Sequence, residues 1–253
     1  MIADSTGWNV GKPGRMINGR MGASRLDVGK FLIAAKASPD EIDRLSTLAA
    51  LSPRAYSIQA HPAGLPDLLP TLRFLDATAA SITSYDPHQL PHLAQTSGYT
   101  DIMLRGTGLL TDGAVADGAA ARQERHTVLS GHTGPIVRSY IREHVLRRAL
   151  PVPVAAGQRR HLHNMVLHPR HHLRIVPASA PLTAVPAFTL FRDSQGNEVV
   201  TVSTPTALLV LDDAGPLATY RRAIAQLTAA ALPGAESTAR VLAPDTFDGE
   251  TTC

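Results

Sequence analysis

The sequence predicts an α+β protein in which helices pack on a mostly antiparallel sheet. Residues 171–211 contain runs in which apolar side chains alternate with their neighbours, the pattern of strands that bury one face. The turn 194–197 joins two of these runs at hairpin length. Helical stretches on both sides of the block favour a sheet covered by helices. The alternating residues are Leu173, Ile175, Phe188, Leu190, Val200 and Val202.

Two helices are expected before residue 52. Ser24 can cap the first helix, whose apolar residues recur at helical spacing up to Ala35. Ser38, Pro39 and Glu41 form the pattern of a capping box with proline at the first helical position, and they predict a second helix up to about Leu51. Prolines and a glycine then mark a linker. We therefore predict a helical region at 1–52, a linker at 53–66, an α+β domain at 67–245 and a flexible tail at 246–253.

Within the larger domain, periodicity and capping residues predict the remaining elements. A helix is expected over 68–81, with Ile82 on its apolar face, and another is capped by Thr96 or Ser97. The other expected elements are helices at 114–129, 154–167, 214–232 and 236–243, a strand at 135–141 and a helical turn at 142–150.

Composition excludes several classes of protein. No apolar run approaches the length of about 20 residues that a membrane span needs, and the first residues lack the features of a secretory signal. The single cysteine, Cys253, allows no internal disulfide, which fits a reducing compartment. We therefore expect a cytoplasmic protein that makes no membrane contact.

The charge balance gives little evidence for nucleic-acid binding. The net charge is +3 and aromatic residues make up 4% of the chain, so platforms for base stacking are not evident. We interpret the cluster of arginines between 142 and 174 as a solvated helix face. The cluster consists of Arg142, Arg147, Arg148, Arg159, Arg160, Arg170 and Arg174.

Histidines are the most conspicuous candidates for metal ligands. There are 11 in the chain, and five lie close together at positions 161, 163, 168, 171 and 172. Helix and strand geometry sends these five side chains in different directions, so we expect no metal site. Because phosphate loops, nucleophile elbows and zinc motifs are also absent from the sequence, we expect no cofactor.

The order of several segments resembles that of XRE-type helix-turn-helix transcriptional regulators with an antitoxin-like C-terminal domain. The resemblance covers about residues 65–243 and implies an α+β domain in which HLRIVP and AFTLF form the first hairpin. The segments are LPDLLPTLRFLDATAASITSYDPHQLPHLAQTSGY at 65–99, ARQERHTVL at 121–129, SYIREHVLRRAL at 139–150, HLRIVP at 172–177, AFTLF at 187–191 and TYRRAIAQLTAAAL at 219–232.

The N-terminal stretch 7–35 resembles only the back half of the DNA-binding domain of this family, without its first helices. Its recognition segment contains Pro13 and Gly14, which cost about 3 and about 1 kcal/mol inside a helix. We therefore expect a truncated, degenerate helix-turn-helix that has lost sequence-specific DNA binding. The residues that would contact DNA, if binding is retained, are Lys12, Arg15, Asn18 and Arg20.

The resemblance also suggests a ligand pocket. At 92–94 the family pattern Gly-Leu-Leu is replaced by His-Leu-Ala, which opens space near His92, Gln95 and Tyr99; a repacked core that fills the gap is the alternative. The pocket would extend over Arg122, Gln123, Glu143 and Arg147. If the helix at 121–129 packs against the step at 139–150, His126 and Glu143 could form an acid–base pair, and a hydrogen-bonded packing network is the alternative.

The sequence and the resemblance suggest three candidate functions. The first is a regulator-family protein that binds a small molecule or a partner protein through its α+β domain. The second is an antitoxin-like interaction module for a small protein, with a homodimer left open. The third is an enzyme recruited from the family for a shape-driven step such as a cyclisation. We expect the first, without specific DNA binding, and keep the enzyme as the alternative.

Overall fold

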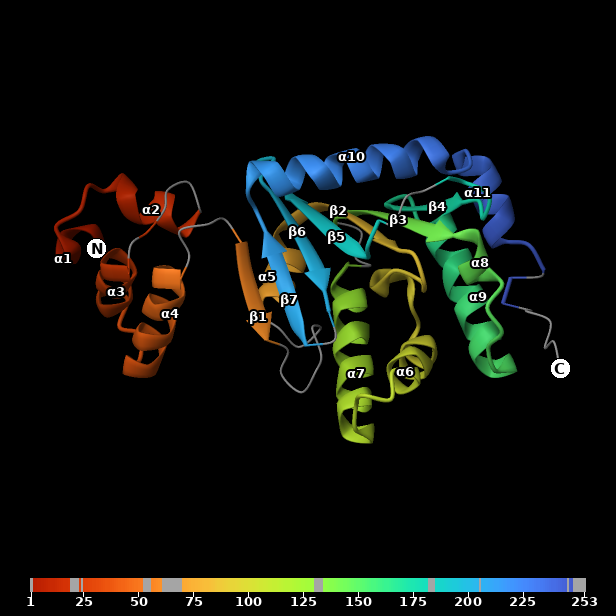
Figure 1. Ribbon diagram of the computed structural model, residues 1–253, viewed down its shortest axis with the longest axis horizontal. Coiled ribbons are helices and arrows are strands. Elements are labelled where there is room, and N and C mark those ends of the chain that lie inside the picture. The colour runs from red at the N-terminus through yellow and green to blue at the C-terminus, as the bar shows by residue number, and fades with distance from the viewer. Residues whose placement is uncertain are drawn as a thin grey trace. The chain divides into compact units, whose positions relative to one another are not determined.

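The computed structural model describes residues 2–18, 23, 25–51, 56–60, 70–129, 134–181, 185–204, 206–244 and 246–247 (Figure 1). The chain forms two compact units that divide between Ser57 and Ile58. No helix in these ranges is long and apolar enough to cross a membrane. The predicted tail beyond residue 247 and the linker residues 53–55 and 61–66 lie outside the described ranges.

The first unit is helical. Its capping box is confirmed: Ser38 Oγ accepts a hydrogen bond from the Glu41 amide at 3.4 Å, and Glu41 Oε2 accepts one from the Ser38 amide at 3.1 Å. These hydrogen bonds lower the pKa of Glu41. The helices are α1 (Ile2–Thr6), α2 (Gly11–Ile17), α3 (Arg25–Ala34) and α4 (Pro39–Leu51).

Replacing Ser38 with alanine should lower the free energy of unfolding of this helical unit by about 1 kcal/mol, because the Glu41 amide at the start of α4 loses its acceptor. Trp8 is the only tryptophan in the chain, so its fluorescence in a urea titration reports on this unit. Ser5→Ala is the control, since the Ser5 hydroxyl is exposed and bonds to the Ile2 carbonyl of its own helix. Equal midpoints for the two variants would contradict the assignment of the cap.

The second unit contains a seven-stranded sheet in the order β1-β7-β6-β5-β2-β3-β4. Strand β2 pairs in parallel with β3, and β3 with β4, while β2–β5, β5–β6 and β6–β7 are antiparallel. The α+β class is thus confirmed, with a mixed sheet. The strands are β1 (Tyr56–Ala60), which spans the division between the units, β2 (Ala79–Asp86), β3 (Ile136–Arg142), β4 (His171–Val176), β5 (Phe188–Asp193), β6 (Glu198–Ser203) and β7 (Ala207–Leu211).

The predicted hairpin at 194–197 is confirmed between β5 and β6, where Gly196 has a φ of +86° that glycine adopts without strain. The hairpin predicted from HLRIVP and AFTLF is wrong. Strand β4 lies at the edge of the sheet beside β3, whereas β5 pairs with β2. The two segments follow each other in sequence but belong to different parts of the sheet.

The helix predicted over 68–81 is also wrong at its end. Helix α5 covers Pro70–Thr78, and the chain continues directly into β2, so Ile82 belongs to a central strand. Strand β2 is buried from Ile82 to Asp86, and polar residues such as Thr83 and Ser84 interrupt its apolar pattern. Ser84 is satisfied inside the sheet by the Ser139 hydroxyl at 3.3 Å. A strand of this composition lacks the alternation that the prediction relied on.

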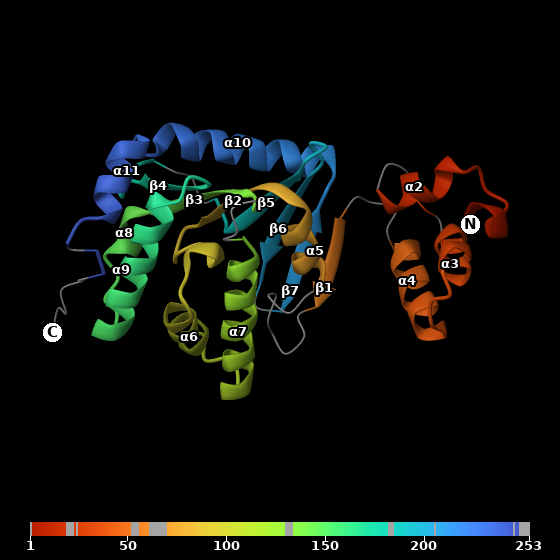
Figure 2. The same ribbon diagram turned by 180° about the vertical axis from the view of Figure 1, so that it is seen from behind.

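Helices cover both faces of the sheet. Helix α10 lies along one face, and α5, α7 and α9 lie on the other (Figures 1 and 2). Strand register explains this division, since Tyr85, Tyr140 and Phe188 point to the α10 face, whereas Ile82, Ile141 and Phe191 point away from it. The further elements are the 3₁₀ turn η3 (His92–Ala94), α6 (Ser97–Gly106), α7 (Asp112–Leu129), α8 (Glu143–Leu146), α9 (Val152–Leu167), α10 (Ala214–Ala230) and α11 (Gly234–Val241).

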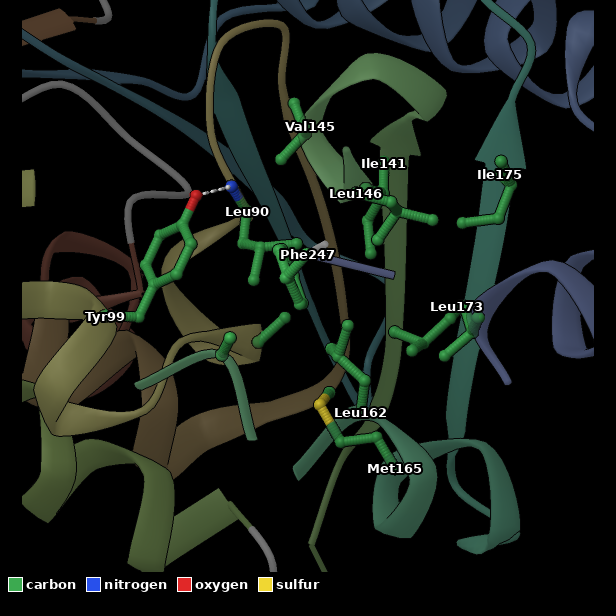
Figure 3. Close-up of a cluster of buried hydrophobic side chains, with 13 residues drawn as sticks. Leu90, Tyr99, Ile141, Val145, Leu146, Leu162, Met165, Leu173, Ile175 and Phe247 are labelled. Carbon is green, nitrogen blue, oxygen red and sulfur yellow. Dashed lines mark hydrogen bonds between the residues drawn. The ribbon is translucent and has the colours of Figure 1, made fainter. Parts of the chain in front are cut away.

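The core between α9 and the sheet contains Tyr99, which is fully buried (Figure 3). Its hydroxyl oxygen accepts a hydrogen bond from the Leu90 amide at 3.2 Å. Beside it, the buried Gln158 donates to the Ala94 carbonyl at 2.7 Å and accepts from the Thr96 amide at 2.8 Å. Thr96 also caps α6, as predicted. These hydrogen bonds fix the segment between β2 and α6 against α9.

The outer edge of strand β4 forms hydrogen bonds with the segment that joins α10 to α11 and with α11 itself. The Ile175 carbonyl accepts a hydrogen bond from the Leu232 amide at 2.8 Å, and the Ile175 amide donates to Ser237 Oγ at 3.1 Å. Arg174 adds a hydrogen bond from Nε to the Leu232 carbonyl at 3.0 Å. The chain after α10 is therefore held along the side of the sheet.

Candidate functional site

Helix α10 covers only part of its face of the sheet. Under the helix the face is apolar, with Tyr85, Phe188 and Val200 buried against Leu217 and Leu227. Where no helix covers it, the same face is polar and opens into a groove of about 610 Å³. The groove is lined by Ser81, Thr83, Arg138, Tyr140, Val166, His171, His172, Leu173, Arg174, Leu190, Arg192, Glu198, Arg221, Ile224, Thr228, Gly234 and Thr238.

Strand register places the polar side chains of the groove in rows. Thr83 of β2 pairs with Arg138 of β3, which pairs with His172 of β4, so these three side chains lie side by side across the sheet. Arg221, Ile224 and Thr228 of α10 form one wall, since they lie three and four residues apart on one helix face. The site is therefore built from residues that are far apart in the sequence.

Glu198 organises one end of the groove. Its carboxylate is 2% exposed and accepts hydrogen bonds from Arg192 Nε at 2.8 Å and from Arg221 Nε at 2.7 Å. One carboxylate thus holds two guanidinium groups and neutralises one of their two charges. Both arginines remain half exposed toward solvent, so they can still attract an anion.

Arg138 differs from the other groove arginines. Among the residues that the structure describes, none forms a hydrogen bond or an ion pair with its guanidinium, which is exposed in the middle of the row. Its neighbour His172 has a lowered pKa, because burial disfavours the charged imidazole and the positive charge of Arg138 adds to that effect. His172 is therefore neutral at pH 7, and the four arginines and one glutamate give the groove a net charge of +3.

The residues predicted for the pocket are only partly brought together. Gln95 is 3% exposed; its Oε1 accepts hydrogen bonds from Arg122 at 2.6 Å and from Thr100 at 3.1 Å, and its Nε2 donates to the Leu90 carbonyl. With Tyr99 fully buried nearby, these residues form a packed polar network. His92 instead lines a separate cavity of about 120 Å³, which also includes Asp86 and Arg125.

The remaining predicted residues do not join this network. Glu143 accepts hydrogen bonds from Arg240 and from Arg147, the latter at 3.2 Å, and from the Ala178 amide at 3.2 Å. The pKa of Glu143 is lowered mainly by the hydrogen bond from Arg240, so this carboxylate is a poor proton acceptor. Gln123 is exposed on α7, and the side chain of His126 lies outside the described part of the chain.

The contacts of Glu143 weigh against the acid–base prediction. Glu143 joins α8 to α11 through Arg240, and its carboxylate is occupied by structural contacts. A general base needs a raised pKa and access to the proton that it abstracts. Glu143 shows the opposite shift, so the alternative of a hydrogen-bonded packing network describes it better.

The residues proposed for DNA contact lie in the first unit. Helix α2 spans seven residues and buries none of them, with Pro13 as its third residue. Lys12 pairs with Asp27 at 2.7 Å and lies over the Trp8 ring at 4.4 Å, and Asn18 donates to the Gly14 carbonyl at 2.8 Å. Arg15 is exposed, and Arg20 lies outside the described residues.

The histidines between 161 and 172 lie on different elements and different faces. Strand β4 buries His171 and exposes His172, as the period of a strand requires. His168 lies against His171, with their ring centroids 4.5 Å apart. Within the described ranges, no group of three or more histidine, cysteine, aspartate or glutamate side chains could hold a metal ion.

The groove was not predicted from the sequence, in which Arg174 is interpreted as part of a solvated helix face. Arg174 instead lies on strand β4 and lines the groove. A signal was present, since charged or polar residues alternate with apolar ones at 172–175. This alternation indicates a groove only when the order of the strands in the sheet is known.

The fold and groove define an α+β domain with an open cationic site on one face of its sheet. The chain belongs to the family described as "Domain of unknown function (DUF5753)", which matches residues 69–243. No curated protein matches the chain. A solved structure of TrmBL2, described as an archaeal chromatin protein with a novel mode of DNA binding, is 12% identical, with 87% of this chain and 68% of that chain covered. Its TM-score of 0.33 is too low to support an argument.

Proposed function

We propose that this chain is a regulator-family protein that acts by binding a small molecule in the groove of its α+β domain. The observation that carries the proposal is the open groove of about 610 Å³, which has the volume of a small-molecule site and a mainly polar and charged lining. In this proposal residues 1–52 are a remnant of a helix-turn-helix domain, and residues 67–245 form the binding domain.

In this proposal the first unit does not recognise a specific DNA sequence. A recognition helix must present several side chains to the major groove while its opposite face is supported by a bundle. Helix α2 has seven residues and no buried side chain, and Lys12 is engaged by Asp27. Phosphate contacts alone would give binding that weakens steeply with salt and is independent of sequence.

Binding is favoured over catalysis by the chemistry of the lining residues. The groove has one carboxylate, Glu198, and two arginines already hold it. A held carboxylate and exposed guanidinium groups suit the recognition of a charged ligand. They do not supply the pair of groups with opposed pKa shifts that acid–base chemistry requires.

Filling the groove tests the proposal. Gly234 lines the groove, and a Cβ at this position would meet no atom within 4 Å, so Gly234→Phe adds a ring without a backbone clash. We expect this variant to weaken binding of two fluorescent probes with one apolar body, the sulfonate 8-anilinonaphthalene-1-sulfonate and the neutral N-phenyl-1-naphthylamine, by about tenfold or more. Fluorescence titration of the full chain measures both affinities.

Gly113→Phe is the matched control, because Gly113 lies in the first turn of α7, away from the groove, and also has open space around it. Thr238→Phe, one turn further along α11, is a second blocking variant. If neither probe binds the folded chain, or if both blocking variants bind like the control, the groove is not a ligand site. Selective retention of one DNA fragment at physiological salt would contradict the assignment of the first unit.

A further inference from the structure

The groove concentrates positive charge. Its four arginines and one glutamate carry a net charge of +3, which equals the net charge of the entire chain. These charges lie on different elements, with Arg138 and Arg174 on parallel strands, Arg192 on β5 and Arg221 on α10. Folding therefore brings them to one place, where their attraction for an anion adds up.

Contacts within the groove single out one arginine as the anchor for a ligand. Arg192 and Arg221 are held by Glu198, and Arg174 donates to the Leu232 carbonyl. Arg138 has no such partner among the described residues, and strand register sets the Thr83 hydroxyl on one side of it and the His172 imidazole on the other. A guanidinium between two hydrogen-bonding side chains can bind an oxyanion through several donors.

Apolar residues lie beside this anchor. Leu190 pairs with Thr83 in the sheet, so it lies in the strand next to Thr83, on the side away from Arg138. Ile224 of α10 lines the groove as well. Leu190 is only 5% exposed, whereas Ile224 is half-buried. An inorganic anion would leave Ile224 in contact with water, and a ligand with an apolar body would cover it.

We infer that the groove binds an organic anion, whose acidic group pairs with Arg138 and whose apolar body lies against Ile224. This inference rests on the proposed function, because it names the chemical class of the molecule that the groove takes. A carboxylate, a sulfonate and a phosphate ester all offer the oxygens that Arg138 would bind. A nucleic acid fits less well, since Tyr140, the aromatic residue among those that line the groove, is 3% exposed and its ring is not available for base stacking.

The two probes test the inference, because they differ only in the sulfonate. The full chain should bind 8-anilinonaphthalene-1-sulfonate at least about tenfold more tightly than N-phenyl-1-naphthylamine. Arg138→Ala should reduce this ratio about tenfold, and Arg138→Lys should restore part of it, since lysine keeps the charge without the planar fork. Arg160→Ala is the control, because Arg160 is exposed on α9 and does not line the groove.

Competition with 1-naphthoate and with 1-naphthyl phosphate distinguishes the two natural sources of the charge. Displacement of the sulfonate probe by either compound supports the inference, and the stronger competitor identifies the preferred acid group. The inference would be overturned if the full chain bound the two probes with equal affinity. It would also be overturned if Arg138→Ala left the ratio of the two affinities unchanged. If Gly234→Phe still weakens the binding of both probes when their affinities are equal, the proposed function stands, and only the inference that the ligand is an anion fails.

Discussion

Replacing Asp76 with alanine is expected to lower the free energy of unfolding of the α+β unit by about 3–5 kcal/mol, because it leaves a buried guanidinium without its counter-charge. Arg125 Nε donates to Asp76 Oδ2 at 2.6 Å, and a second nitrogen donates to Oδ1 at 3.2 Å. The two side chains are 6% and 3% exposed. This ion pair joins α5 to α7 beneath the sheet, and no sequence pattern predicted it.

Urea denaturation followed by far-UV circular dichroism measures this effect. Glu124→Ala is the matched control: Glu124 lies one residue before Arg125 and pairs with Arg73 at 3.1 Å, but both side chains are more than half exposed. Its loss should cost at most about 0.5 kcal/mol. The double variant Asp76→Ala, Arg125→Met should recover much of the lost stability, because it removes the orphaned charge. An Asp76→Ala midpoint equal to that of Glu124→Ala would contradict the buried ion pair.

Tyr99→Ala should lower the free energy of unfolding by about 3–5 kcal/mol, the cost of removing a buried aromatic ring from a packed core. Tyr99 is fully buried among Leu90, Leu162 and Phe247 (Figure 3). Tyr99→Phe should cost about 1–3 kcal/mol, since the buried Leu90 amide loses its acceptor while the ring remains.

The same urea titration distinguishes this role from the pocket predicted from the sequence. A pocket residue would tolerate truncation with little loss of stability and would change probe binding instead. We expect the reverse, with a large loss of stability and unchanged affinity for both naphthalene probes in the conditions where Tyr99→Phe is folded. Tyr85→Phe is a useful control, because Tyr85 is also buried but lies on the opposite face of the sheet, under α10. An undiminished stability of Tyr99→Ala would show that the ring lies in open space.

Local signals predicted the local features of this fold. The capping box at Ser38, the cap at Thr96 and the β5–β6 turn at Gly196 are formed by residues a few positions apart, and the structure confirms all three. The first residues of strand β2, up to Ser81, were predicted as helix because the polar residues of the strand hide the period of two. Its neighbours in the sheet, β3 and β5, come more than fifty and more than one hundred residues later, so no local window contains the pairing that stabilises it.

The candidate site was harder to predict for the same reason. Arg138, Arg192 and Arg221 come together only through the strand order and the path of α10, which no short motif encodes. The residues that resemblance suggested, Gln95 and Arg122, do meet, but as a buried hydrogen-bond network. Glu143 proved to be a structural partner of Arg240. Sequence spacing identified which polar residues are unusual without showing whether they face the core or an open surface.

The bonded state of Ile175 limits how other polypeptides can engage this sheet. Proteins often recruit a peptide by β-augmentation, in which an incoming strand satisfies the free amide and carbonyl groups of an edge. At β4 those groups of Ile175 are already taken by Leu232 and Ser237. An added strand would have to strip away both contacts, so this edge is protected at that point from templated aggregation.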